Sequence, residues 1–375
     1  MTAACALTGF PAHAQLVAAS TFTVIEDPNK AADALPTEPP PPTLVSIRGA
    51  VGAPNVRALC AAILARGTGL SPIPYTPIKR LELLDAGAGD SGAASVADVL
   101  NNGALMGVAL ESVSLVRCGV GPEGAATLGN ALMLGGNTSL LSLSLDCNLL
   151  GDVGTRLLCR GLLTNRSLKR LSLASVGMGE SGAFEIASYI NSSLCVLEAL
   201  DLSGNNIGVA GLQSLSVSAL YSKTLVELTL CNCGLSSRRQ ETLIAADLAL
   251  AIATGGSDAI ASATAAAAAT ATTTTDTLTT NAVATAAAAA VVVVTAAAFD
   301  ALGRALASTD CALGSVDLDG NPMNEADAAA LIPYLTAPPP KVTKLIVPKT
   351  LKSETFIALF RNVVAKAKKG GKAKK

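Results

Sequence analysis

The chain has 375 residues with a formal net charge of −1 at neutral pH, and only 3% of them are aromatic. Leucine, alanine and valine must therefore supply the core of a chain long enough for two or three ordinary domains. The single histidine, His13, lies outside every segment expected to fold, which excludes Ser-His-Asp and Cys-His nucleophile systems.

Residues 1–43 are expected to be disordered, and they end in the polyproline-type spacer "PTEPPPP". Their first part contains Pro11 and no Lys or Arg before Lys30, which argues against a secretory signal. Residues 44–77 read as a short strand, a helix with Pro54 near its start, and a linker. We expect this segment to be an N-terminal cap or a degenerate repeat that shields the first core layer.

A repeated pattern, L-x-x-L-x-L-x-x-N/C with variants, begins at residue 78 and occurs six times within residues 78–252 and twice after residue 297. The eight segments start at Ile78, Leu110, Leu140, Leu168, Leu197, Leu225, Leu313 and Val342. Apart from the step from 225 to 313, the starts lie 28 to 32 residues apart. Apolar and polar residues alternate within each segment, which predicts a strand with one face buried and the other in water.

Glycines recur with the same period as these segments. A G-x-x-G pair follows each of the first five starts by 11 residues, at 89/92, 121/124, 151/154, 179/182 and 208/211. In the fourth unit the pair completes "GMGESG", which alone suggests a dinucleotide site. The first glycine of that motif is replaced by Leu149 and Asn206 in two other units. The pairs therefore indicate tight strand-to-helix turns of a repeated β-α solenoid rather than an NAD site.

The pattern resembles the ribonuclease-inhibitor subtype of leucine-rich repeats from Ile78 to about Val363, apart from one insertion. The resemblance implies an α/β solenoid in the form of an open horseshoe, with short parallel strands on the concave face and helices on the convex face. It also implies that an Asn or Cys at the ninth position bonds backbone groups of the turn. Residues of this kind are Cys118, Asn148, Asn205, Cys233 and Asn321, whereas Ala86, Val176 and Thr350 depart from the pattern.

Residues 253–296 are almost wholly Ala, Thr, Val, Ser and Gly. Residues 277–299 carry no charge and are long enough to span a membrane, but alanine is barely hydrophobic and Asp276 and Asp300 flank them without a basic anchor. We expect a low-complexity insertion outside the core, partly helical or disordered, whose deletion leaves the melting transition nearly unchanged. A decayed repeat between residues 238 and 312 stays open as an alternative.

Residues 297–365 are expected to hold a helix, the last two repeats and a closing helix. Residues 366–375 are a basic tail with six lysines, which cannot bury enough apolar surface to fold. The tail is interpreted either as a solubilising end or as a weak, salt-sensitive contact to a polyanion. Its lysines are Lys366, Lys368, Lys369, Lys372, Lys374 and Lys375.

Cysteine usage and acidic pairs give no cofactor site. Nine cysteines without a C-x-x-C favour reduced, structural roles and a cytosolic or nuclear compartment. Asp317 and Asp319 resemble part of a calcium loop, but the glutamate at the required spacing is missing. The glycosylation-like triplets at Asn137 and Asn165 lie three residues before a repeat start, so we interpret them as turn residues. No cofactor, metal or small-molecule substrate is predicted.

The candidate site is the polar face of the strands, because positions three, five, seven and eight of each repeat point out of the concave sheet. Its middle is a neutral serine stripe, and its later part is acidic. It is interpreted as a solvated face or as a groove whose acidic end, with exposed Asp201, Glu227 and Asp317, meets a basic protein surface. The candidate residues are Arg80, Glu82, Ser112, Ser114, Ser142, Ser144, Arg170, Ser172, Asp201, Glu227, Thr229, Asp317 and Asp319.

The leading functional hypothesis is a non-enzymatic scaffold in the cytoplasm that binds a protein through its concave face. Ordered repeats with a lysine tail also resemble leucine-rich-repeat proteins of the cytoskeleton and of flagellated cells, which implies a cytoskeletal, ciliary or flagellar location. The alternative is a GTPase activator resembling the Ran GTPase-activating protein. That family implies a functional arginine on an early loop and an acidic C-terminal stretch, whereas no motif matches Arg66 or Arg117 and the tail is basic. Ribonuclease inhibition is disfavoured because that horseshoe is longer and richer in cysteine, tryptophan and acidic groups.

Overall fold

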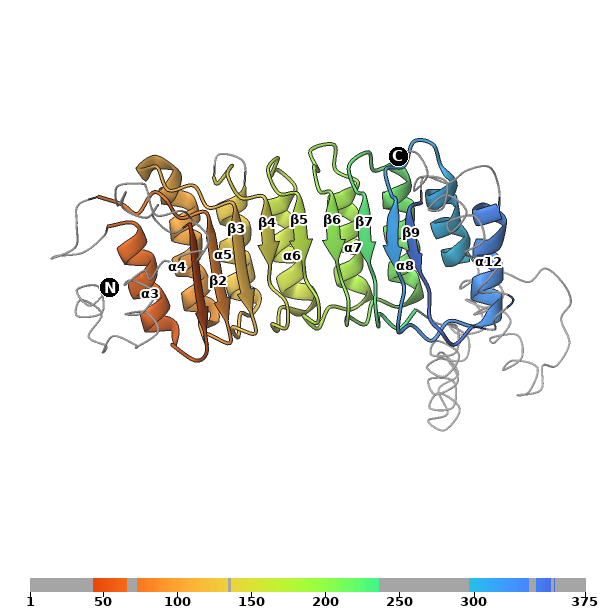
Figure 1. Cartoon of the computed structure of the whole chain (residues 1–375), viewed down its shortest axis with the longest axis horizontal. Helices are drawn as coiled ribbons and strands as arrows, with labels where there is room; N and C mark the ends of the chain where they lie inside the picture. The colour runs from red at the N-terminus through yellow and green to blue at the C-terminus, as the bar shows by residue number, and fades with distance from the viewer. Residues whose placement is uncertain are drawn as a thin grey trace, which may run out of the picture. The chain divides into compact units, whose positions relative to one another are not determined.

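The structure is a computed structural model that describes residues 43–65, 73–133, 136–235, 297–336, 342–351 and 354. The chain divides into two compact units, of which the first comprises residues up to 178 and 188–201 and the second comprises 179–187 and 202 onward. Short strands and helices alternate along both units (Figure 1), which confirms the leucine-rich-repeat solenoid. The insertion at 253–296 and the tail at 366–375 lie outside the described residues.

The first unit contains six parallel strands that follow one another in chain order. The apolar residue of each strand's second position pairs in register with its neighbours, from Val45 to Leu200, and each is at most 5% exposed. One buried row therefore runs through the unit and fixes the register. The strands are β1 (Leu44–Arg48), β2 (Arg80–Leu84), β3 (Ser112–Val116), β4 (Ser142–Ser144), β5 (Arg170–Ser172) and β6 (Ala199–Asp201).

The second unit contains β7 (Glu227–Thr229), β8 (Ser315–Asp317) and β9 (Lys344–Ile346), again parallel and in chain order. Leu228 pairs directly with Val316, although 88 residues separate them in the sequence. The sixth and seventh repeats are therefore adjacent in the sheet despite their long separation in the sequence, and no decayed repeat places a strand between β7 and β8.

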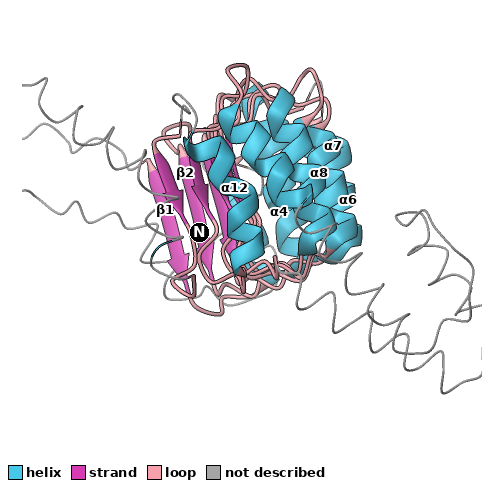
Figure 2. Ribbon diagram, turned by 90° about the vertical axis from the view of Figure 1, so that its right-hand side faces the viewer, coloured by secondary structure: helices cyan, strands magenta, loops and turns pink. Residues whose placement is uncertain are grey.

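Helices pack against one face of the strands and form the second layer (Figure 2). Each buries the side that faces the sheet, as Leu128 of α5 and Leu158 of α6 illustrate. A short 3-10 helix, η1 (Ala104–Met106), follows α4, and a helix over 297–307 precedes β8. The labelled helices are α3 (Ala53–Ile63), α4 (Gly89–Gly103), α5 (Pro122–Leu132), α6 (Gly151–Leu162), α7 (Glu180–Ile190), α8 (Gly208–Tyr221) and α12 (Glu325–Thr336).

The recurring glycine pairs serve the turn from strand to helix. At the first glycine of the pair the backbone is left-handed in three repeats, with φ 56° at Gly89, 58° at Gly151 and 66° at Gly208. At the second glycine the helix packs closely against its neighbours, since a Cβ on Gly154 would lie 3.1 Å from the Cα of Pro122, which is tighter than most side-chain contacts. The interpretation as tight turns with close backbone approach is therefore confirmed.

Strand length differs between the repeats, because β1, β2 and β3 have five residues and the later strands have three. The ladder of β2 and β3 continues to a fifth residue, where Leu84 pairs with Val116. In the next repeat the equivalent position holds Asp146, whose carboxylate hydrogen-bonds Ser144 and so turns back toward the strand. No helix within the described ranges has both the length and the apolar character needed to cross a membrane.

Candidate functional site

The first unit brings nine of the predicted site residues into two rows on the strand face that its helices do not cover. In each strand these residues alternate with the buried core residues, so their side chains leave the sheet on the opposite side. The first row runs across β2 to β5 and consists of Arg80, Ser112, Ser142 and Arg170. The second row runs across β2 to β6 and consists of Glu82, Ser114, Ser144, Ser172 and Asp201.

Asp146 joins this face just beyond β4, although it is not one of the residues that the sequence predicted. Its Oδ1 accepts hydrogen bonds from the Ser172 hydroxyl at 2.6 Å and the Ala174 N–H at 2.9 Å, and its Oδ2 accepts one from the Ser144 hydroxyl at 2.8 Å. Two serines of the predicted stripe thus donate hydrogen bonds to one carboxylate. One feature of the sequence indicates that Asp146 belongs to this face, because it occupies position seven of its repeat and that position is expected to point outward.

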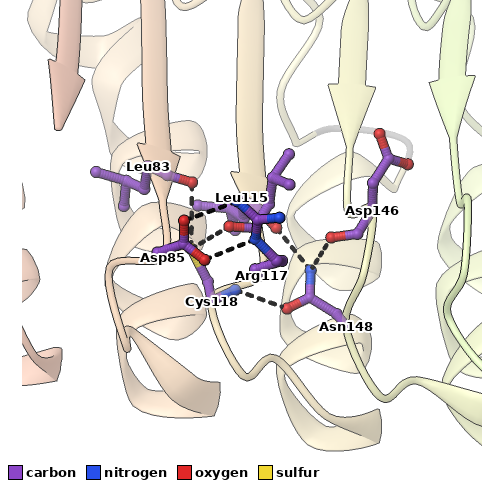
Figure 3. Close-up of polar contacts among 8 residues, drawn as sticks. Leu83, Asp85, Leu115, Arg117, Cys118, Asp146 and Asn148 are labelled. Carbon is purple, nitrogen blue, oxygen red and sulfur yellow. Dashed lines mark hydrogen bonds and ion pairs between the residues drawn. The ribbon is translucent and has the colours of Figure 1, made fainter. Parts of the chain in front are cut away.

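The residue at position eight is left-handed in repeat after repeat. Asp85, Arg117 and Cys147 have φ values of 55°, 52° and 57°, a region that non-glycine residues seldom adopt. The turn side chains of neighbouring repeats meet there, because Arg117 donates from Nε to Asp85 Oδ1 at 2.6 Å and from Nη2 to Oδ2 at 2.9 Å (Figure 3). The hydrogen bond from Arg117 holds the pKa of Asp85 below its ordinary value. Arg66 lies outside the described residues.

The ninth position fastens neighbouring turns together from inside. The side chain of Asn148, which is 1% exposed, accepts hydrogen bonds from the N–H groups of Val120 and of Cys118, each at 3.0 Å. Figure 3 shows the bond from Cys118. The Nδ2 of Asn148 donates to the carbonyls of Leu115 and Leu145 at 2.6 and 2.7 Å. Cys118 donates its thiol to a strand carbonyl of the preceding repeat. The backbone role that the family resemblance implied is therefore confirmed at these positions.

In the second unit, Asn321 makes the same four kinds of bond, three of them to the preceding repeat and one to the carbonyl of Leu318 in its own repeat. In the first unit, Asn137 and Asn165 accept the N–H groups of the residues two and three positions later, and they are 2% and 3% exposed. The interpretation of these two asparagines as helix-to-strand turn residues is therefore confirmed.

The predicted acidic end is distributed over both units. Asp201 lies in the first unit, whereas Glu227, Thr229, Asp317 and Asp319 lie in the second. Glu227 is exposed, but Asp201 and Asp317 are only half-exposed, so the expectation that all three are exposed is wrong for two of them. A short carboxylate in a parallel sheet lies low between the side chains of adjoining strands, and Asp317 also accepts the N–H of Asp319 at 3.0 Å.

Within the described ranges, no group of three or more His, Cys, Asp or Glu side chains could hold a metal ion. The lysines of the tail lie outside those ranges. What the described residues offer on the strand face is a set of hydrogen-bonding and charged side chains at regular spacing, set on a stiff sheet.

Comparisons with known proteins agree with the repeat assignment. A family model described as "Leucine Rich repeat" matches residues 193–216. The chain is 38% identical over 136 residues to the NACHT, LRR and PYD domains-containing protein 12 of Mus musculus, a match that covers 36% of this chain and 13% of that protein. It is 36% identical over 135 residues to the ribonuclease inhibitor of Sus scrofa, covering 36% of this chain and 29% of the inhibitor. The chain thus matches less than a third of either relative's length.

Among solved structures, the chain is similar to the C-terminal domain of tropomodulin from Caenorhabditis elegans at 12% identity and a TM-score of 0.32. That match covers 67% of this chain and 99% of the tropomodulin domain. A likeness of this strength is too weak to support a shared function.

Proposed function

Because the chain is a leucine-rich-repeat protein of the type seen in the ribonuclease inhibitor, we propose that it is a non-enzymatic scaffold that binds a protein partner through its exposed strand face. The observation that carries this proposal is the pair of register-aligned polar rows in the first unit. Side chains held in register on a sheet lose little conformational entropy on binding, which favours recognition of an extended surface.

The composition of this face fits a partner of moderate affinity. Its serines are short and half-exposed, so a partner backbone can approach closely and meet hydroxyl groups. It has no tryptophan or tyrosine among its row residues, and such aromatic anchors dominate the tightest interfaces. A scaffold that assembles and releases its partner is consistent with this surface.

A steric block of the face tests the proposal. The full-length protein carrying Ser112→Tyr and Ser142→Tyr is used as bait in its source cells, with cross-linking and mass spectrometry to identify captured proteins and contact positions. We expect the two tyrosines to remove partners whose cross-links map to β3 and β4. The matched control carries Ser91→Tyr and Ser188→Tyr, two exposed serines of α4 and α7. A capture profile that the block leaves unchanged contradicts the proposed face.

The acidic residues support a second contact with a basic protein surface. Replacing Asp201, Glu227 and Asp317 together with serine is expected to weaken capture of such a partner while the melting transition is kept. An unchanged interaction profile after this triple substitution rejects the acidic contact.

A cytoskeletal, ciliary or flagellar location and a polyanion contact of the tail stay predictions that rest on the sequence. The tail is tested by a truncation ending at Val364, which should lose salt-sensitive sedimentation with microtubules or binding to nucleic acid. Undiminished binding by the truncated protein makes the tail a solvated end. The GTPase-activator alternative gains no support, since Arg117 is engaged by Asp85.

A further inference from the structure

Both arginines of the first row, on the strand face of the first unit, have no partner within the described residues. Arg80 on β2 and Arg170 on β5 are exposed, and neither forms an ion pair or a side-chain hydrogen bond within the described residues. Three other basic residues at the ends of these strands are each paired with an acid of an adjoining repeat. The pairs are Lys79–Glu111 at 3.2 Å, Arg117–Asp85 at 2.6 Å and Lys169–Glu198 at 2.7 Å.

The two unpaired arginines belong to one straight row. Arg80 pairs in register with Ser112, Ser112 with Ser142, and Ser142 with Arg170. Three strand spacings of about 4.8 Å separate the arginine backbones by about 14 Å. The two serines between them are short and half-exposed, so the middle of the row is lower than its ends, and each end carries a guanidinium group.

We propose that this row binds an acidic polypeptide segment of a partner protein, extended across the strands with one carboxylate on each arginine. Four residues of an extended chain span about 14 Å, and residues four apart point to the same side. The matching segment therefore has Asp or Glu at positions i and i+4. Guanidinium groups suit this role because their planar donors engage both oxygens of a carboxylate. This inference rests on the proposed function and names the chemistry of its partner.

Acidic side chains on the same face weaken the attraction between the arginine row and an acidic segment. The carboxylate of Asp146 is surrounded by donors from Ser144, Ser172 and Ala174, which offset its charge. Glu82 lies two residues beyond Arg80 on the same side of β2 and forms no ion pair within the described residues. Glu82 is therefore a side chain that opposes an acidic segment, and its neutralisation should strengthen binding.

The test measures binding of fluorescent peptides to the full-length protein by anisotropy. One peptide carries two glutamates separated by three Ser or Thr residues, and a second has the same composition with the glutamates adjacent. We expect the first to bind more tightly, and Arg80→Ser and Arg170→Ser each to weaken it about fivefold, the upper range for an exposed ion pair. Glu82→Gln should strengthen it about twofold, and added salt should weaken it.

The matched control removes two exposed arginines from the helix layer, Arg156→Ser and Arg160→Ser on α6, and should leave binding unchanged. The inference is overturned if neither peptide binds, if both bind equally, or if the α6 control weakens binding as much as the row variants. These outcomes leave the proposed function standing as long as the Ser112→Tyr and Ser142→Tyr block still removes captured partners.

Discussion

The carboxylate of Asp90 on α4 accepts a hydrogen bond from the backbone N–H of Gly121, at 2.6 Å, in the following repeat. The same oxygen accepts the N–H of Gly124 at 2.9 Å, in the first turn of α5. Gly121 precedes α5 and has no side chain to cap it, so the preceding repeat supplies the cap. The repeats of the first unit are thereby coupled through side chains as well as through the sheet.

Loss of this cap should destabilise the first unit. Asp90→Ala is expected to lower the free energy of unfolding by about 1 kcal/mol, the usual cost of removing a helix cap. Urea unfolding followed by circular dichroism measures the change. Ser91→Ala, at an exposed neighbour on the same helix, should stay within about 0.5 kcal/mol of the parent protein. Equal stability of the two variants would mean that the bonds to α5 contribute nothing net.

The ninth position should tolerate cysteine better than alanine. Asn148→Ala removes the partner of two N–H groups and two strand carbonyls, and we expect a loss of about 3 kcal/mol, since buried groups left unsatisfied are costly. Asn148→Cys should lose roughly half as much, because the thiol of Cys118 already donates to a strand carbonyl in the equivalent place.

The measurement is again the midpoint of urea unfolding, with the exposed Asn130→Ala of α5 as a control that should change little. If the cysteine and alanine variants are equally unstable, the thiol does not substitute for the amide, and the ninth-position cysteines pack without contributing a useful hydrogen bond.

The repeat period and the alternation of buried residues were predictable because each repeat meets the same environment. Leu143, Leu171 and Leu200 are the buried centres of their strands, as the alternation of apolar and polar residues predicted, and the asparagines of the turns bond the backbone as expected. Each of these features depends on one position within a single repeat, and residues of the same type recur at that position in many of the repeats.

Contacts between repeats were not predictable in the same way. The bond from Gly121 to Asp90 and the pair of Arg117 with Asp85 join residues 31 and 32 positions apart, and each depends on side-chain reach. The left-handed backbone at position eight could not be predicted from most repeats, because that position holds residues of many types. Gly204 and Gly320 occupy that position in two repeats with φ near 70°, and their recurrence there was the available indication.

The pairing of Arg117 with Asp85 should be visible in the titration of the carboxyl group. The hydrogen bond lowers the pKa of Asp85 in the folded protein, so the group favours folding above its unfolded pKa and loses this contribution as the pH falls through the folded value. Arg117→Lys keeps the charge but not the two-pronged bond and should raise the pKa of Asp85 part of the way toward its ordinary value. Carbon-detected NMR of labelled aspartate measures both, and an unshifted Asp85 in the parent protein contradicts the pairing.

Cysteine reactivity should separate the buried thiol of α3 from the exposed one near β4. Burial, assisted by the charge of Asp98, raises the pKa of Cys60 to about 12, whereas Cys147 is exposed. At pH 8 only about one Cys60 thiol in ten thousand is then ionised, which is about a thousandfold below an ordinary thiol of pKa near 9. Alkylation with iodoacetamide, followed peptide by peptide by mass spectrometry, should therefore label Cys147 first and Cys60 only with unfolding.

The same shift predicts how stability depends on alkaline pH. A thiol whose pKa is raised by folding contributes fully below its unfolded pKa of 9.0, and the contribution falls as the pH rises from there toward about 12. Cys60→Val fills the site without an ionisable group, so its free energy of unfolding should decline less steeply over this interval than that of the parent protein. Urea melts of both proteins between pH 8.5 and about 10.5 measure how steeply each free energy of unfolding declines with pH. A shift of one pKa unit between the unfolded and folded states corresponds to about 1.4 kcal/mol of this free energy. Parallel slopes, or rapid labelling of Cys60 in native conditions, would mean that α3 opens readily and that its thiol meets water.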